Sequence, residues 1–159
     1  MEPKLQKMMQ FVDHCSDPKK LRQLAKNAEE QGADDVAQAA RRKLYSILPA
    51  DEPGTIEHAV WQSIYALEDV LKQERGKTIM LSRTRQKIAR QGEIQCVADL
   101  VRGPASEGFR MLLERNLLEL SFEAVALQFP EKFDAELLDA AEIRLSDVGY
   151  SIRDPSAAS

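Results

Sequence analysis

The residues of this sequence that are best placed to do chemistry are basic. Between Lys72 and Arg90 the chain carries seven Lys and Arg residues against one acid, a local charge of +6 in a protein of net charge −4. We call 72–90 the basic segment. Because Lys and Arg bind phosphates and displace their counterions, the segment predicts binding to a polyanion. Its cations are Lys72, Arg75, Lys77, Arg83, Arg85, Lys87 and Arg90.

Helical spacing separates the four cations of residues 80–91 into two sets. At 100° per residue, Arg83, Lys87 and Arg90 fall within a sector of roughly 60°. Arg85 lies on the far side of an apolar stripe that includes Ile88. We therefore expect the first three to form one basic face toward solvent. Arg85 is the cation that we expect to have an acidic partner inside the protein.

Two other interpretations of the basic segment stay open. Its cations could pair with the protein's own acids, for example Glu57, Glu68 and Asp69. They could also contact an acidic protein partner, because residues 114–147 hold nine acids against three bases. In that case a helix such as 134–147 of a partner or a second copy would dock on the basic face.

Length and composition indicate a globular protein. A chain of 159 residues forms one domain, or a small helical domain with a helical appendage. The pI near 5.3 excludes a general nucleic-acid coat, so polyanion binding must be local. Two distant cysteines predict reduced thiols, and the first residues do not resemble a signal peptide. No apolar run is long enough to span a membrane, so we expect a cytoplasmic protein.

The first 48 residues predict three helices. Apolar spacing predicts a helix over 3–14. Asp17 and Pro18 are an N-cap and a first-turn proline, and Gly32 ends the helix that they begin. Alanines on that helix and on the next one, 33–48, permit close approach, so we expect them to form an antiparallel hairpin.

The remainder predicts six more helices after a break at 49–54, where prolines and a glycine interrupt the chain. The first is long and carries a regular apolar stripe, so we expect it to be the central helix of the fold. No segment shows the alternation of a strand. The predicted ranges are 55–75, 80–91 with Ser82 as an alternative start, 93–101, 106–116, 121–129 and 134–149.

Several motifs do not complete a site. Lys77 lies in a Gly-Lys-Thr sequence, but the preceding glycine and strand of a phosphate-binding loop are missing. His14 and Cys15 are adjacent and so point apart on a helix, and nothing completes four metal ligands. Trp61 and Tyr65 could stack on bases, although their helical spacing favours a core role. We predict no catalytic residue, cofactor or metal site.

The two helices around Gly92 have the outline of a helix-turn-helix. The second of them, however, carries Glu93 and Asp99 and no Lys or Arg before Arg102. That composition is poor for reading base edges. If nucleic acid binds, we expect the first of the two helices to contact it through the backbone phosphates.

One recurring pattern resembles a known group of proteins. The residues are Gly76-Lys77-Thr78 through Ser82-Arg83-Thr84-Arg85-Gln86-Lys87, followed by Gly108-Phe109 and Phe122-Glu123-Ala124-Val125. They resemble a group of small, functionally uncharacterised bacterial all-helical proteins, over residues 55–146. The resemblance implies a bacterial cytosolic helical domain and assigns no site residue.

The sequence as a whole predicts an all-α fold, a compact array of about eight or nine helices with an N-terminal helical hairpin. We expect a hairpin region at 1–48, a main bundle at 55–149 and a flexible tail at 150–159, within one domain or two. The leading functional hypothesis is a non-enzymatic protein that binds nucleic acid, DNA rather than RNA. The residues expected to contact it are Arg83, Lys87 and Arg90, with Lys77, Arg75 and Arg85 in support.

Overall fold

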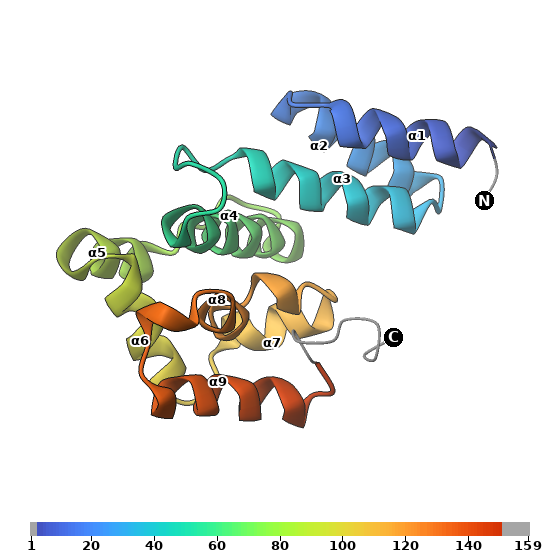
Figure 1. The fold of residues 1–159 in the computed structure, drawn as a ribbon. Helices are drawn as coiled ribbons and strands as arrows, with labels where there is room; N and C mark the ends of the chain where they lie inside the picture. Colours follow the sequence, from blue (N-terminus) through green and yellow to red (C-terminus); the bar gives the residue numbers. More distant parts are fainter. Residues whose placement is uncertain (1–2, 151–159) are drawn as a thin grey trace. The chain divides into compact units, whose positions relative to one another are not determined.

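The computed structural model describes residues 3–150, which form nine α-helices and two short 3-10 helices with no strand among them (Figure 1). This confirms the predicted all-α fold. Residues 151–159 of the predicted tail lie outside the described part. The chain divides into two units, residues 1–50 and 51–159. Within residues 3–150, no helix combines the length and the apolar character that crossing a membrane requires.

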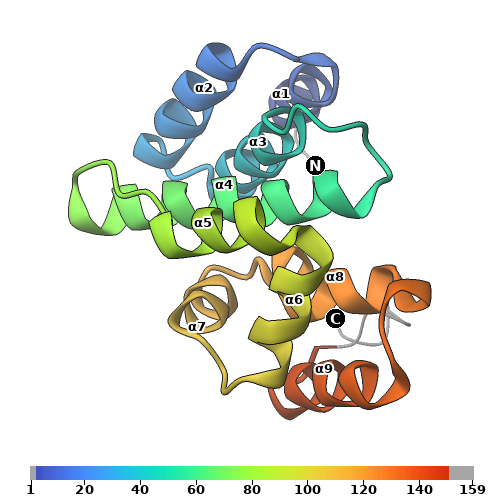
Figure 2. The ribbon, with the colours of Figure 1, turned by 90° about the vertical axis from the view of Figure 1, so that its left-hand side faces the viewer.

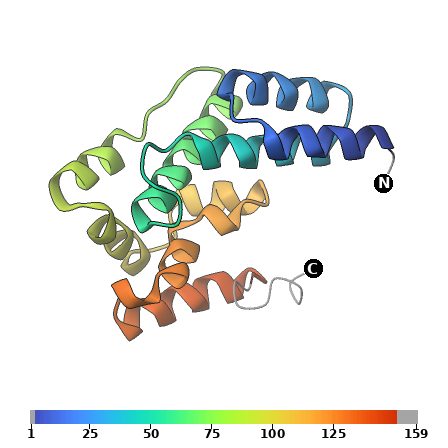
Figure 3. The same ribbon diagram turned by 45° about the horizontal axis from the view of Figure 1, so that its top comes forward.

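The first unit contains three helices: α1 (Pro3–His14), α2 (Pro18–Glu30) and α3 (Asp34–Ile47). The third helix packs against both of the others, and all three are visible in Figure 3. Small residues make the close contact possible, because Ala28 and Ala37 are buried together with Val36. The pairing of α2 with α3 agrees with the expected hairpin, and α1 adds a third helix to it.

The second unit contains the other helices. The longest, α4 (Ile56–Arg75), begins after Thr55, whose hydroxyl accepts the N–H of His58. It ends at Gly76, which has a φ of 72°, a conformation that glycine adopts without strain. The others are α5 (Ser82–Gln91), α6 (Glu93–Arg102), α7 (Glu107–Glu114), α8 (Phe122–Gln128) and α9 (Ala135–Asp147), with 3-10 turns at Leu118–Leu120 and Pro130–Lys132.

The core of the second unit lies around α6 and α8. Both contact α4 on one side and α9 on the other. The stripe predicted on α4 is buried, with Val60 and Ile64 fully covered. Val97 of α6 and Leu137 of α9 belong to the same apolar cluster. This core holds α6 in place. The single residue Gly92 joins the end of α5 to the start of α6 (Figure 2).

Side-chain caps set the helix starts that the sequence predicts. Oxygens of Asp17, Ser106, Ser121 and Asp134 each accept a backbone N–H two or three residues later. Of the two starts that the sequence offers for α5, Ser82 is confirmed and Met80 is two residues too early. The reason is a tertiary contact, because the N–H of Leu81, the residue before Ser82, donates to the carboxylate of Glu68 on α4. The 3-10 turns had no signal in the apolar pattern.

Candidate nucleic-acid interface

The helix α5 carries the central part of the basic segment. Only Ile88 of its residues is buried, and Leu81 just before it is half-buried, so the apolar stripe predicted for this helix faces inward. The opposite face is turned away from the core. The helix is ten residues long, and α6 is the helix against which it packs most extensively.

Two arginines form the open part of this face. Arg83 and Arg90 are both exposed, and helical geometry places them about 20° apart around the axis. Among residues 3–150, neither has an ion-pair or hydrogen-bond partner. These guanidinium groups therefore keep all of their N–H donors for a ligand or for water.

Lys87 differs from the prediction that it faces solvent alone. Its Nζ lies 2.8 Å from Oδ2 of Asp99 on α6, and each side chain is about one-third exposed. The hydrogen bond from Lys87 is the main reason that the pKa of Asp99 is lowered. The pair ties α5 to α6, so two of the three cations on the face are unpaired and the third is shared.

Arg85 has the internal acidic partner that the sequence predicted. Its Nε and Nη2 each donate to a carboxylate oxygen of Glu68 on α4, at 2.7 Å. Glu68 also accepts the N–H of Leu81 at 2.9 Å. The hydrogen bond to Glu68 raises the pKa of the Arg85 guanidinium, so this cation stays charged and engaged. Two of its three guanidinium nitrogens are therefore engaged by Glu68.

The aromatic residues of α4 lie beneath the same guanidinium. The carbon at the centre of the Arg85 guanidinium is 5.2 Å from the ring centre of Trp61 and 5.8 Å from that of Tyr65. Trp61 also donates its indole N–H to Glu93 of α6, at 3.3 Å. Because Arg85 lies over both rings, they make cation–π contacts within the protein.

The remaining cations of the basic segment lie at the end of α4 and in the loop after it. Lys72 and Lys77 are exposed and have no partner among the described residues. Arg75 is exposed as well and lies 3.9 Å from Glu107, a distant contact between two solvated groups. The Gly-Lys-Thr sequence around Lys77 follows a helix, so the strand of a phosphate-binding loop is not there.

The polar groups of α6 are used inside the protein. Glu93 accepts from Trp61, Asp99 binds Lys87, and Arg102 pairs with Asp134 at 2.9 Å. This helix therefore has few groups left to read base edges, as its composition predicted.

The sequence pointed to Glu68 as one of several possible partners of the cations in the basic segment. It gave no signal for Asp99, which the one-residue turn at Gly92 brings back beside α5.

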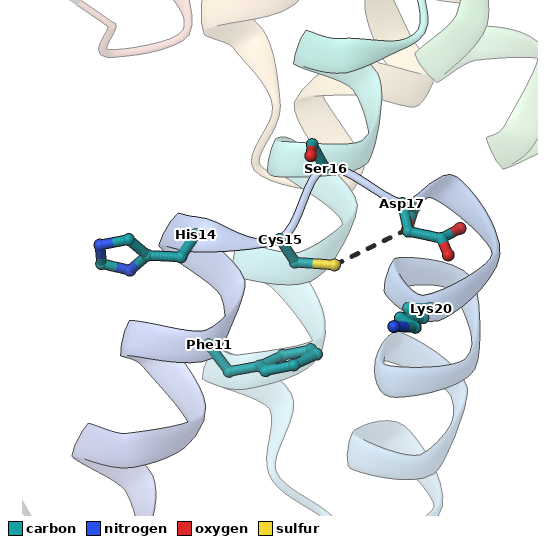
Figure 4. A pocket seen from close by; sticks show the side chains of 6 residues that line it. All are labelled: Phe11, His14, Cys15, Ser16, Asp17 and Lys20. Atoms are coloured by element: carbon teal, nitrogen blue, oxygen red, sulfur yellow. Dashed lines mark hydrogen bonds between the residues drawn. The ribbon is translucent and has the colours of Figure 1, made fainter.

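A hollow in the first unit brings together the neighbouring residues His14 and Cys15. In the first unit a hollow of about 350 Å³ is lined by residues that include His14, Cys15 and Lys20 (Figure 4). The imidazole of His14 points away from the thiol of Cys15, which faces the carbonyl of Asp17 at 3.8 Å. Over the described residues, no three His, Cys, Asp or Glu side chains gather as a metal site would require.

Comparison with known proteins gives no further guide. No family model, no curated protein and no solved structure matches this chain. The geometry of α5 and its neighbours therefore carries the functional argument.

Proposed function

We propose that the second unit binds nucleic acid by placing the exposed face of α5 against backbone phosphates. The observation that carries this proposal is the pair Arg83 and Arg90, two exposed cations on one helical face with no partner among residues 3–150. Helices displayed only for solubility usually alternate their charges, whereas the outward face of α5 holds only cations and uncharged residues.

The neighbouring cations support this contact to different degrees. Lys87 is shared with Asp99, but its ammonium has three N–H donors and remains partly exposed, so it can bind a phosphate as well. Lys77 lies in the loop that leads into α5, and Lys72 and Arg75 lie in the last turn of α4. Arg85 has a structural role instead, because its hydrogen bonds to Glu68 hold α5 to α4.

The widths of the major grooves favour duplex DNA over duplex RNA as the ligand of α5. Ten residues make a helix about 15 Å long, and the major groove of B-DNA admits an α-helix. The major groove of A-form RNA is too narrow for side chains to read. Because the contacts go to phosphates, we expect little preference for sequence.

A steep salt dependence is the first expected property. If about three phosphates are neutralised, affinity for B-DNA should fall roughly 40-fold between about 50 mM and 200 mM salt. The range for two to four contacts is about tenfold to 150-fold. Filter-binding titrations with a duplex of about 20 base pairs measure this slope. Single-stranded DNA and duplex RNA of equal length serve as competitors.

The decisive variant reverses both unpaired arginines. Arg83→Glu with Arg90→Glu should weaken binding at least tenfold at low salt, because two attractive contacts become repulsive. The matched control is Arg22→Glu with Lys26→Glu, which makes the same charge change at two exposed cations of α2. Circular dichroism should be unchanged in both variants.

Two outcomes would contradict the proposal. One is a doubly reversed α5 variant that binds as tightly as the unaltered protein. The other is an equal loss of affinity in the α2 control, because this would show that overall charge and not the face of α5 determines binding.

A further inference from the structure

We infer that α9 is a docking surface for the basic face of α5 from a second copy of this chain. The inference concerns self-association, and it does not depend on nucleic-acid binding. The occupant is chosen by charge: residues 72–90 carry +6, and residues 114–147 carry −6. Both segments belong to the second unit, so two copies could each offer one of each.

The outward face of α9 is acidic with an apolar centre. Glu136, Asp139, Ile143 and Asp147 fall within a sector of roughly 80° around the helix. The three acids are exposed and have no partner among residues 3–150. Ile143 is 60% exposed, more than any other large hydrophobic residue in the described chain.

A hollow lies along the same helix. It has a volume of about 400 Å³ and is lined by residues that include Asp139, Ile143 and Asp147. An exposed isoleucine beside a hollow with an acidic rim offers both apolar contact and charge. A helix whose cations have aliphatic stems can use both, because Lys and Arg cover apolar surface while their charged ends reach outward.

The spacing of charges on the two helices agrees. Arg83 and Arg90 are seven residues apart, or about 10 Å along α5. Asp139 and Asp147 are eight residues apart, or about 12 Å along α9. Antiparallel or parallel docking can therefore pair both arginines with both aspartates. The centre of the contact would hold Ile143 against the stems of residues on α5.

The contact must form between copies. In Figure 2, α6 lies between α5 and α9 of the same chain. No ion pair joins α5 to α9 within residues 3–150. Two copies can exchange these contacts reciprocally, α5 of each on α9 of the other, which gives a closed two-fold dimer. The dimer would cover Arg83 and Arg90, so a second copy and a polyanion would compete for the same face.

The test reverses one helix at a time. Variant A carries Arg83→Glu and Arg90→Glu, and variant B carries Asp139→Lys and Asp147→Lys. Each variant alone then presents two helices of equal sign. An equimolar mixture restores two complementary contacts, acidic α5 of A on basic α9 of B and basic α5 of B on acidic α9 of A. Variant B also separates this inference from the proposed function, because its α5 is intact.

Sedimentation velocity at up to about 200 μM protein and low salt is the measurement. We expect a dimer for the unaltered protein and for the Arg22→Glu, Lys26→Glu control, monomers for A and for B, and a dimer for their mixture. The reversal of either helix should weaken association at least tenfold. An unaltered protein that is monomeric, a dimer that persists in A or B, or a mixture that remains monomeric would each overturn the inference. An unaltered protein that binds an added basic protein but does not associate with itself would also overturn the inference.

Discussion

The carboxylate of Glu68 holds the guanidinium of Arg85 through two hydrogen bonds of 2.7 Å, one to each carboxylate oxygen. The same carboxylate accepts the backbone N–H of Leu81, the residue before α5 begins. Glu68 of α4 therefore holds both the residue that precedes α5 and an arginine on the inward face of α5. With Arg85 held inward, Arg83 and Arg90 lie on the exposed face of α5.

Removing that carboxylate should destabilise the second unit. Glu68→Ala leaves the Arg85 guanidinium and the N–H of Leu81 without their partner in a partly buried place. We expect the free energy of unfolding to fall by about 1–3 kcal/mol, measured by urea denaturation followed by circular dichroism. The control is Arg75→Ala, which removes an exposed contact and should cost less than about 0.5 kcal/mol. Equal losses in the two variants would show that Glu68 has no special structural part.

The ion pair between Glu123 and Arg144 is more deeply buried and should be worth more to break. Its atoms lie 2.6 Å apart, with side-chain exposures of 6% and 18%, and Arg144 also donates to the carbonyl of Gly103. Glu123→Ala leaves an uncompensated buried cation, so we expect a loss of about 3–5 kcal/mol.

A double replacement tests the reason for that loss. Glu123→Leu with Arg144→Met removes both charges and retains apolar volume, so the expected loss of unfolding free energy is smaller than for Glu123→Ala alone. Urea denaturation of the three proteins checks the order. A double variant less stable than Glu123→Ala would contradict the explanation by an uncompensated charge.

Stability should depend on pH through Cys96. Burial of this fully covered residue raises the pKa of its thiol from 9.0 to about 11. Between these values the unfolded chain loses the thiol proton first, and the folded chain still binds it. The free energy of unfolding should therefore be unaffected by this group below about pH 8 and fall as pH rises, by at most about 1.4 kcal/mol per unit.

Comparison with Cys96→Ala isolates the thiol from the other groups that titrate at high pH. Urea denaturation at about pH 8 and about pH 10 gives the slope for each protein. The unaltered protein should lose stability more steeply over this interval. Parallel slopes would show that the thiol ionises equally in the folded and unfolded chain.

The sequence predicted the helices well because their starts and ends have local chemical causes. Thr55, Ser106 and Ser121 cap helices through their own side chains, and Gly76 ends α4 through its own backbone freedom. Such signals lie within a few residues of the feature that they determine. The 3-10 turn Leu118–Leu120 follows Asn116, which has a positive φ of 58°, and no apolar period announces it.

The candidate site was predictable only in part. Helical spacing was sufficient to separate Arg85 from the face of Arg83 and Arg90, because angular position follows from residue number. Spacing could not show that Lys87 meets Asp99, since this depends on how α6 folds back after Gly92. Tertiary contacts between helices are set by packing, and a single sequence does not reveal them.

Trp61 is the only tryptophan of the chain, and its place gives the protein an intrinsic optical signal. Its ring lies 5.2 Å from the Arg85 guanidinium of α5, and its indole N–H is bonded to Glu93 at the start of α6. Tryptophan fluorescence responds to nearby charge and to solvent. The emission of the unlabelled protein therefore reports on how α5 and α6 sit against α4, the part of the molecule that displays Arg83 and Arg90.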